Sequence, residues 1–296
     1  MIDNKMTPKY SREKTPKINV VGSVNLDLVA TVERLPGTGE TVSGLTLERF
    51  PGGKGANQAL AAHRLGADVS FFACVGDDNI ADEALSILKD EGVKLDYCKR
   101  SSDEPTGQAL IAVSLEGENQ IVVIPGANSI NFLNQDFHLP TADALICQLE
   151  IPIETVEIVS SNFSGFFCIN LAPAVEISAR LMSRADLIVV NETEAAFYGN
   201  IIHQRQGYTA ITYGPKKAKL FSDGKIIAKT TPPKVKSIDT TGAGDAFTAA
   251  LTVALTKNQP PENALKYACT AGALATMIKG AQTSLPTEET VLASLG

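Results

Sequence analysis

Short apolar runs recur along the chain, and segments with helical periodicity lie between them. Six runs are continuous, rich in β-branched residues and bounded by turn residues, which is typical of buried strands. They lie at 18–24, 69–76, 144–151, 166–173, 186–192 and 209–214. Helices are predicted at 54–65 with Gly66 as the cap, at 80–92, from Pro152, near 177–185, directly after 192, at 243–257 and at 261–278. Because strands and helices alternate, the pattern predicts a mostly parallel sheet with helices on both faces.

Three other segments alternate between apolar and polar positions and do not fit that buried sheet. They lie at 26–35, 41–50 and 107–124, and the last contains the turn "EGEN". We expect antiparallel strands with one wet face, forming a small β lid from about 27–50 and 107–124. A further hairpin is predicted at 218–230. The chain is thus expected to be a single α/β domain over 18–296 with a β lid.

Composition narrows the class of protein. The net charge is −7, which argues against nucleic-acid or anionic-membrane partners. The longest apolar runs, near 246–255 and 268–278, fall short of the ~18 residues that suggest a membrane span. Residues 1–17 carry five Lys/Arg against two Asp/Glu and no apolar stretch that resembles a signal core, so we interpret them as a flexible tail.

The cysteines and histidines narrow the expected compartment and the expected type of site. Five cysteines without a CxxC pair are typical of reduced, buried thiols in a cytoplasmic protein. None of the three histidines has a neighbour at metal-ligand spacing. A zinc site or a Ser-His-Asp hydrolase is therefore not expected.

The stretch "DTTGAGDAF" at 239–247 places glycines and an aspartate at the start of an apolar helix. It is neither a P-loop nor a dinucleotide fingerprint, because the required spacing is absent. Its glycines can expose the N–H groups of Ala243, Gly244 and Asp245 as an anion hole for a phosphoryl group. Asp245 could then accept a proton from an attacking hydroxyl, with a pKa kept low by the helix start. The alternative is that Asp245 caps the helix, and the motif alone favours neither.

Further polar residues follow predicted strands or open helices. "GSVNLD" carries Asn25 and Asp27, "GGKGANQ" carries Lys54, Asn57 and Gln58, and "CQLE" carries Glu150. Each alone is better interpreted as a turn residue or a cap. Together, at strand ends of an α/β sheet, they favour a site for a polar ligand.

With these residues assembled, the chain resembles the ribokinase family within the ribokinase-like (PfkB) sugar kinases. "GSVNLD", "GGKGANQA", "NETE" and "DTTGAGD" occur in the family's order. The resemblance implies the ribokinase-like fold and an ATP-dependent phosphotransferase acting on the 5-hydroxyl of D-ribose. It also implies Mg²⁺, a monovalent cation (K⁺), and a homodimer joined through the β lid.

The resemblance also implies roles for individual residues. Asp245 would be the base beside an anion hole of Gly242, Ala243 and Gly244. The sugar would be bound by Asn25, Asp27, Gly53, Lys54, Gly55, Asn57, Glu150 and Asp245. The nucleotide would be bound by Asn191, Thr212, Gly214, Lys216, Gly244 and Cys269. The metal positions would be Glu194 near Mg²⁺, and for the monovalent cation Asp239, Thr241, Ala275, Ile278, Gly280 and Ser284.

Two departures from the family pattern lie on the nucleotide side. Lys217 stands where members often have glycine, and only seventeen residues separate Glu194 from Thr212. "NETE" is also a sequence that caps a helix start. The remaining alternatives are a kinase of deoxyribose, a nucleoside or another sugar, and a non-catalytic sugar-binding protein on the same fold.

Overall fold

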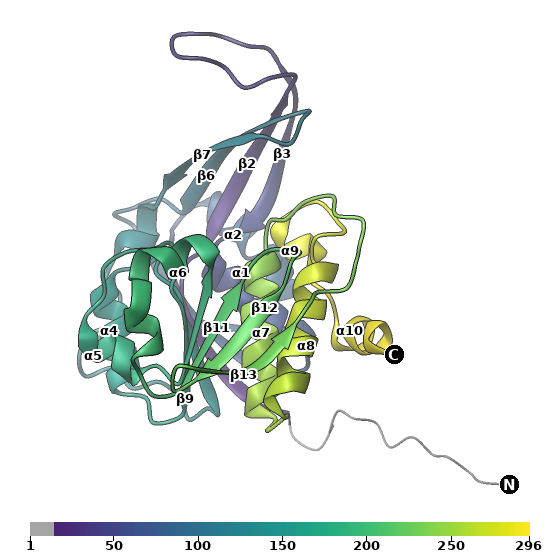
Figure 1. Ribbon diagram of the computed structural model, residues 1–296. Helices are drawn as coiled ribbons and strands as arrows, with labels where there is room; N and C mark the ends of the chain where they lie inside the picture. The colour runs from purple at the N-terminus through teal and green to yellow at the C-terminus, as the bar shows by residue number, and fades with distance from the viewer. Residues whose placement is uncertain (1–14) are drawn as a thin grey trace, which may run out of the picture.

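A computed structural model describes residues 15–296 as an α/β body with a small sheet projecting from one end (Figure 1). Within this range the body holds a nine-stranded sheet in the order β13-β12-β11-β10-β9-β8-β1-β4-β5. Its strands are β1 Lys17–Val21, β4 Asp68–Gly76, β5 Lys94–Ser101, β8 Ala144–Cys147, β9 Phe166–Asn170, β10 Leu187–Asn191, β11 Tyr208–Thr212, β12 Ala218–Ser222 and β13 Lys225–Thr230. All neighbours pair in parallel except the β11–β12 and β12–β13 pairs.

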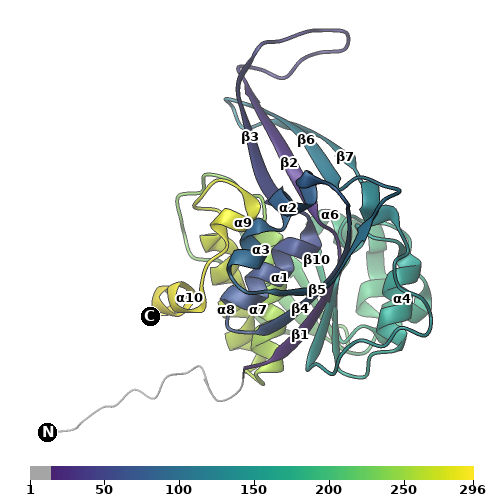
Figure 2. The same cartoon turned by 180° about the vertical axis from the view of Figure 1, so that it is seen from behind.

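Helices cover both faces of this sheet, as Figures 1 and 2 show from opposite sides. They are α1 Lys54–Arg64, α2 Asn79–Ala84, α3 Ser86–Asp90, α4 Ile153–Ser161, α5 Ala179–Arg184, α6 Glu192–Tyr198, α7 Ala243–Thr256, α8 Pro261–Leu274, α9 Ala281–Ser284 and α10 Glu288–Leu295. The described residues also form two 3₁₀ turns, η1 Gly126–Ser129 and η2 Gly199–His203. Along β4, Phe71 enters the core beneath α1, α7 and α8, while Phe72 enters the core beneath α4 and α5. This alternation is expected for strands buried on both faces.

The lid is a four-stranded sheet in the order β3-β2-β6-β7. Its strands are β2 Asn25–Val32, β3 Gly44–Gly52, β6 Gly107–Ser114 and β7 Asn119–Ile124. The two hairpin pairs are antiparallel as expected, but β2 pairs with β6 in parallel, so the lid is a mixed sheet. The expectation of one wet face is wrong at β7, where Ile121, Val122 and Val123 are all exposed.

Several elements differ from the sequence expectation. β5 was not predicted, because its edge position allows an exposed, charge-rich sequence, KLDYCKRS. The helix expected at 80–92 is divided at Leu85 into α2 and α3. The helix expected at 261–278 is α8, which ends at Leu274, and the Thr276 carbonyl just beyond it accepts hydrogen bonds from the N–H groups of Ile238 and Asp239. The short helices α9 and α10 that follow were not predicted.

The tail boundary also moves. Lys17 already pairs with Asp68 as the first residue of β1, and the Pro16 carbonyl accepts from the Asp68 N–H at 2.9 Å. The expected tail therefore ends before Pro16, and its residues 1–14 lie outside the described range. Within residues 15–296, no helix combines the length and the apolar character needed to cross a bilayer.

Candidate active site

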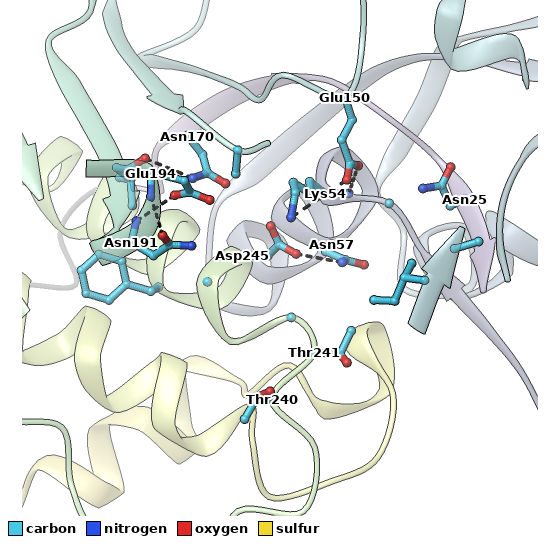
Figure 3. A pocket seen from close by; sticks show the side chains of 18 of the residues that line it. Asn25, Lys54, Asn57, Glu150, Asn170, Asn191, Glu194, Thr240, Thr241 and Asp245 are labelled. Atoms are coloured by element: carbon cyan, nitrogen blue, oxygen red, sulfur yellow. Dashed lines mark hydrogen bonds and ion pairs between the residues drawn. The ribbon is translucent and has the colours of Figure 1, made fainter. Parts of the chain in front are cut away.

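A cavity of about 390 Å³ lies between the lid and the carboxyl-terminal edge of the parallel strands (Figure 3). Asn170, Asn191 and Thr212 end β9, β10 and β11 and line one side of it. Ile111, Ile121 and Val123 cover it from the lid. The first turn of α7 forms the floor with Gly244 and Asp245. The carboxyl ends of parallel strands are where open α/β sheets bind ligands.

Asp245 does not cap its helix. The N-cap is Gly242, at φ 79°, and no side chain caps α7. The Asp245 carboxylate instead accepts hydrogen bonds from Asn57 Nδ2 at 2.9 Å and from Gln58 Nε2 at 2.8 Å. The capping alternative left open by the sequence is therefore wrong, and a buried carboxylate faces a polar cavity.

The anion hole expected at residues 242–245 has fewer free N–H donors than the three that the sequence suggests. The Ala243 N–H donates to the Thr240 carbonyl at 3.3 Å. Among the described residues, the N–H groups of Gly244 and Asp245 have no such partner, so two donors remain for an anion. A Cβ at position 244 would meet no atom within 4 Å, so the cavity side of this glycine is open.

The expected low pKa of Asp245 is contradicted. Burial raises the pKa of Asp245, although the Lys54 ammonium and the hydrogen bonds from Asn57 and Gln58 act in the opposite direction. Desolvation of a carboxylate outweighs the helix start here. For Lys54, burial alone would lower the pKa, but the carboxylates of Asp245 and Glu150 raise it. Lys54 therefore stays charged beside Asp245.

The loop before α1 is held against the first strand by close backbone contact. Gly53 adopts φ 89°, and a Cβ there would lie 2.7 Å from the Asn25 nitrogen. A Cβ on Gly55 would lie 2.4 Å from the Ser23 nitrogen. Gly55, expected to bind sugar, thus packs against the loop after β1 and is fully buried, whereas Gly53 lines the cavity.

Glu150 supports this loop. Its Oε2 accepts from Ser23 Oγ at 2.6 Å and from the Lys54 backbone N–H at 3.0 Å. Its Oε1 lies 4.0 Å from Lys54 Nζ. Glu150 also lines the cavity (Figure 3), so one carboxylate both orders the glycine loop and faces a ligand.

Asp27 and Asn25 reach the cavity from β2. Burial raises the pKa of Asp27 to about 7, and the nearby carboxylates Glu150 and Asp245 add to the effect. The Asp27 side chain lies against Gly52 of β3, where a Cβ would fall 2.5 Å from its Oδ2. Asn25 Oδ1 accepts from Asn128 Nδ2 at 2.8 Å, which fixes the orientation of its amide.

The "NETE" segment forms a capping box at the start of α6. Asn191 Oδ1 accepts from the Glu194 N–H at 2.9 Å, and Glu194 Oε2 accepts from the Asn191 N–H at 2.7 Å. Both residues also line the cavity. Burial raises the pKa of Glu194. The helix-start interpretation is therefore confirmed, and it leaves Glu194 Oε1 facing the cavity side without a capping role.

Several expected nucleotide contacts lie away from the cavity lining. Gly214 and Lys216 are exposed on the β11–β12 connection, where Lys217 and Lys219 each hold their ammonium 5.4 Å from the centre of the Tyr213 ring. Cys269 is only 3% exposed in the core between α7 and α8, and burial raises its pKa to about 12.

The residues implied for the monovalent cation lie in two loops that Asp239 joins. Asp239 Oδ1 accepts from the Thr241 N–H and hydroxyl, and Oδ2 accepts from the Gly280 N–H at 2.9 Å. Burial opposes the charge, but these hydrogen bonds lower the pKa of Asp239. Ala275 and Ser284 are buried beside these loops, and Ile278 is exposed. Thr241 reaches the cavity, so the joined loops border it.

Sequence reasoning missed three amides of the hydrogen-bonded network that reaches Asp245. Gln58 was recognised only as a polar residue, and Asn170 and Gln148 were not singled out. Asn170 ends β9 and lines the cavity, and Gln148 directly follows β8. The available signal was the one that identified Glu150, a polar residue at the end of an apolar strand.

Comparison with known proteins agrees with this geometry. The family model described as pfkB family carbohydrate kinase matches residues 15–288. A ribokinase of Bacillus subtilis is 37% identical over 290 residues, covering 93% of this chain and 97% of that protein. The crystal structure of ribokinase from Thermotoga maritima superposes with a TM-score of 0.84 at 32% identity, covering 95% of this chain and 99% of that one. Ribokinase of Arabidopsis thaliana, solved with ribose and ATP, gives a TM-score of 0.83 at 30% identity, with 95% and 99% covered.

Proposed function

This chain belongs to the pfkB family of carbohydrate kinases, which transfer a phosphoryl group to an alcohol, and we propose that it phosphorylates the 5-hydroxyl of D-ribose with ATP. The observation that carries the proposal is Asp245, a buried carboxylate that two amide donors hold between Lys54 and the start of α7. Relatives named ribokinase cover nearly the whole chain. One of them, from Arabidopsis thaliana, was solved with ribose and ATP.

In the proposed reaction the sugar lies between the lid and the strand ends. All four residues that would bind it line the cavity. Asp27 and Glu150 accept hydrogen bonds from its hydroxyls, Lys54 donates, and the Asn25 amide can donate. Asp245 accepts the proton of the attacking hydroxyl as the new P–O bond forms and the bond to ADP breaks. The N–H groups of Gly244 and Asp245 receive the charge on the transferring phosphoryl oxygens. Ile111 and Ile121 of the lid reduce the access of water.

ATP and Mg²⁺ are assigned to the side of the cavity formed by the start of α6 and the ends of β10 and β11. Asn191 and Thr212 line that side. No group of three or more His, Cys, Asp or Glu that could hold a metal is found within residues 15–296. A single carboxylate such as Glu194 fits Mg²⁺, because this ion usually binds one or two carboxylates together with substrate phosphates. When bound, Mg²⁺ neutralises charge on the phosphates.

K⁺, a homodimer and a cytoplasmic location complete the proposal. Asp239 joins the loop before α7 to the loop after α8 by accepting from the Thr241 and Gly280 N–H groups, and we infer that backbone carbonyls of these loops hold the monovalent cation. Exposed apolar side chains on the lid, including Leu47 and Val122, suit a second copy of the chain. All five cysteines are free thiols, which is typical of a reducing compartment.

The test of the base is Asp245→Asn. We expect kcat to fall by ~10²–10⁴-fold, the usual contribution of a general base. The new amide can be accommodated, because Asn57 Oδ1 has no partner among the described residues and can turn to accept from it. The melting temperature should therefore hold or rise, since a desolvated carboxylate is removed. Near-normal turnover in a folded variant would overturn the assignment.

Two further measurements identify the preferred acceptor and distinguish an enzyme from a sugar-binding protein. A kinase assay over ribose, deoxyribose, hexoses and nucleosides ranks the acceptors by kcat/KM, and ribose should rank first. Calorimetry with ribose in the same preparation distinguishes an enzyme from a sugar-binding protein. Binding of ribose without turnover in the presence of ATP, Mg²⁺ and K⁺ would favour the non-catalytic alternative.

A further inference from the structure

Two glutamines behind the cavity form a hydrogen-bonded chain that ends on Asp245. Gln58 of α1 and Gln148, directly after β8, are both fully buried. Gln58 Nε2 donates to Asp245 Oδ1 at 2.8 Å and to Asn170 Oδ1 at 3.1 Å. Gln148 Nε2 donates to Gln58 Oε1 at 2.7 Å. The two glutamines thus lie behind Asn170 and Asp245, the members of the network that line the cavity (Figure 3).

The chain has only one consistent direction. The Asp245 carboxylate, when ionised, can only accept hydrogen bonds. Asn170 Nδ2 donates to the Val189 carbonyl at 3.1 Å, so its Oδ1 is turned toward Gln58. Gln58 must therefore present its NH₂ group to two acceptors, which leaves its Oε1 facing Gln148. A Gln58 amide turned the other way would set its oxygen against both acceptors.

The fold prepares the place for Gln148. β8 and β9 pair in parallel with Cys147 opposite Ile169, so Gln148, directly after β8, lies beside Asn170, the last residue of β9. A Cβ at Gly22 would lie 2.0 Å from Gln148 Oε1. Glycine at position 22 thus leaves room for this amide between β1 and α1.

We propose that Gln148 is a positioning residue for the base: its donor fixes the Gln58 amide in the orientation that keeps a hydrogen-bond donor on Asp245. The inference rests on the proposed role of Asp245 and adds two residues to it. With Oδ1 held by Gln58 and Oδ2 by Asn57, the carboxylate is aimed at the cavity before the sugar binds. Gln148 Oε1 is buried and has no hydrogen-bond partner among the described residues, so the side chain of Gln148 is tied to the network through its donor to Gln58.

Loss of the hydrogen bond from Gln58 is expected to raise the pKa of Asp245. Donors to a carboxylate favour its charged form, and Asp245 must be charged to accept a proton. The other charged groups around it are Lys54 of α1, Glu150 after β8, Asp27 of β2 and Glu194 of α6. None of these groups is altered by a substitution at Gln148. The fall of kcat at low pH, which we call the acidic limb, reflects protonation of Asp245, so a shift of this limb reports on the chain of amides.

The experiment is a double-mutant cycle in the full-length enzyme with ribose and ATP. Gln58→Met should lower kcat by ~10–100-fold and Gln148→Met by ~3–10-fold, as expected for losing or weakening a hydrogen bond to a charged group. In the double variant the loss should not exceed that of Gln58→Met alone, because Gln148 acts through Gln58. The acidic limb of kcat should move to higher pH in each variant, while the KM for ribose and for ATP holds. Gln259→Met, at the opposite end of α7, is the matched control and should leave both kcat and the limb unchanged.

A second variant keeps the test decisive if Gln148→Met does not fold. Gln148→Glu can donate to Gln58 only while its carboxyl is protonated, so its deficit in kcat should grow as the pH rises. The deficit of Gln58→Met should instead be largest at low pH. Additive losses in the cycle, or a wild-type kcat and pH profile in Gln148→Met, would overturn the proposal. If Asp245→Asn is inactive while Gln148→Met is normal, only the positioning role fails; if Asp245→Asn is active, the base assignment itself fails.

Discussion

At the scale of single residues, Asp27 is the carboxylate whose burial has the clearest energetic consequence. Burial and the neighbouring carboxylates raise its pKa to about 7 from an ordinary value of 3.8. A carboxyl group whose pKa is higher in the folded than in the unfolded protein destabilises the fold as the pH rises through that interval. The cost is absent below pH 4 and complete above pH 7. Asp27 is thus maintained at the expense of stability, as expected of a residue that binds substrate.

Asp27→Asn should therefore stabilise the protein in a pH-dependent way. The free energy of unfolding should rise by about 2–4 kcal/mol at pH 8 and by very little at pH 4, because the pKa difference acts only between these limits. Denaturant unfolding of both proteins at the two pH values measures it. Asp90→Asn, on the exposed end of α3, serves as the control. An equal gain at both pH values would mean that the ionisation of Asp27 is not the cause.

Asp27 also separates binding of the sugar from binding of the nucleotide. Asp27→Ala removes acceptors for sugar hydroxyls and leaves their bonds unmade, so the affinity for ribose should fall by ~10–10³-fold. ATP is assigned to the other side of the cavity, near Thr212, and its affinity should change little. Calorimetry with each ligand alone gives the two constants. Equal losses for both would identify Asp27 as a structural residue.

Polar residues that line the cavity were predictable from the sequence, but their environment was not. Glu150 follows a buried apolar strand, whereas Lys54 and Asp245 stand in glycine-rich stretches that open apolar helices, and these two patterns are sufficient to select them. The pKa of Asp245 was wrongly expected to be low, because local reasoning from the helix start does not include burial by distant segments. The partners Gln58 and Gln148 come from segments 90 residues apart, and no local pattern reports such a contact.

At the scale of elements, Asp239 links the loop before α7 to the loop after α8, so that the two loops act as one unit. Its two oxygens hold Thr241 and Gly280, and a Cβ on Gly242 would lie only 3.1 Å from Ala281. Whatever orders the loop at 275–280 therefore orders the start of α7. The cation proposed between these loops would fix the two N–H donors that face the phosphoryl group.

We expect K⁺ to raise kcat through this unit. At matched ionic strength, the rate in potassium chloride should exceed the rate in tetramethylammonium chloride, because the organic cation is too large for a site made of carbonyls. Asp239→Ala should reduce the difference between the two salts, since it unlinks the loops. Equal rates of the unaltered enzyme in both salts would remove the cation from the proposal.

Element boundaries show where pattern reasoning ends. The long apolar strands and helices were found, because burial on both faces gives an unbroken signal. β5 was missed because an edge strand tolerates Lys94, Asp96 and Arg100 on its exposed positions. The helix at 261 ends four residues earlier than expected, and the Thr276 carbonyl just beyond it accepts from the 238–239 backbone, a contact between segments that the sequence does not indicate.

At the scale of the whole molecule, the family and fold expected from the motifs are confirmed. Alternation of strands and helices predicts a parallel sheet, since few other arrangements bury every apolar run. The lid was predicted as a separate small sheet, but the parallel pairing of β2 with β6 was not. That pairing joins two strands that are separated by about 75 residues in sequence. It forms because β2 and β6 both leave the body at the same edge, and this arrangement is a property of the whole fold that no local sequence pattern indicates.

The lid carries the last prediction, the oligomeric state. Leu110 and Val122 lie opposite each other across β6 and β7 and are 46% and 59% exposed. Leu47 of β3 is 68% exposed. A four-stranded sheet with apolar side chains exposed on its surface needs a covering surface, and a second lid offers one of matching character.

We therefore expect a dimer at micromolar concentration, measured by light scattering coupled to size exclusion. Leu110→Lys should shift the population toward the monomer, because a stable interface of roughly 1,600 Å² tolerates a buried, unpaired charge poorly. Leu115→Lys is the matched control: this leucine is equally apolar and 68% exposed, but it lies in the β6–β7 turn beyond the paired strands. It should leave the dimer intact. A monomer in the unaltered protein, or the same shift in both variants, would show that the exposed strands of the lid are not the interface.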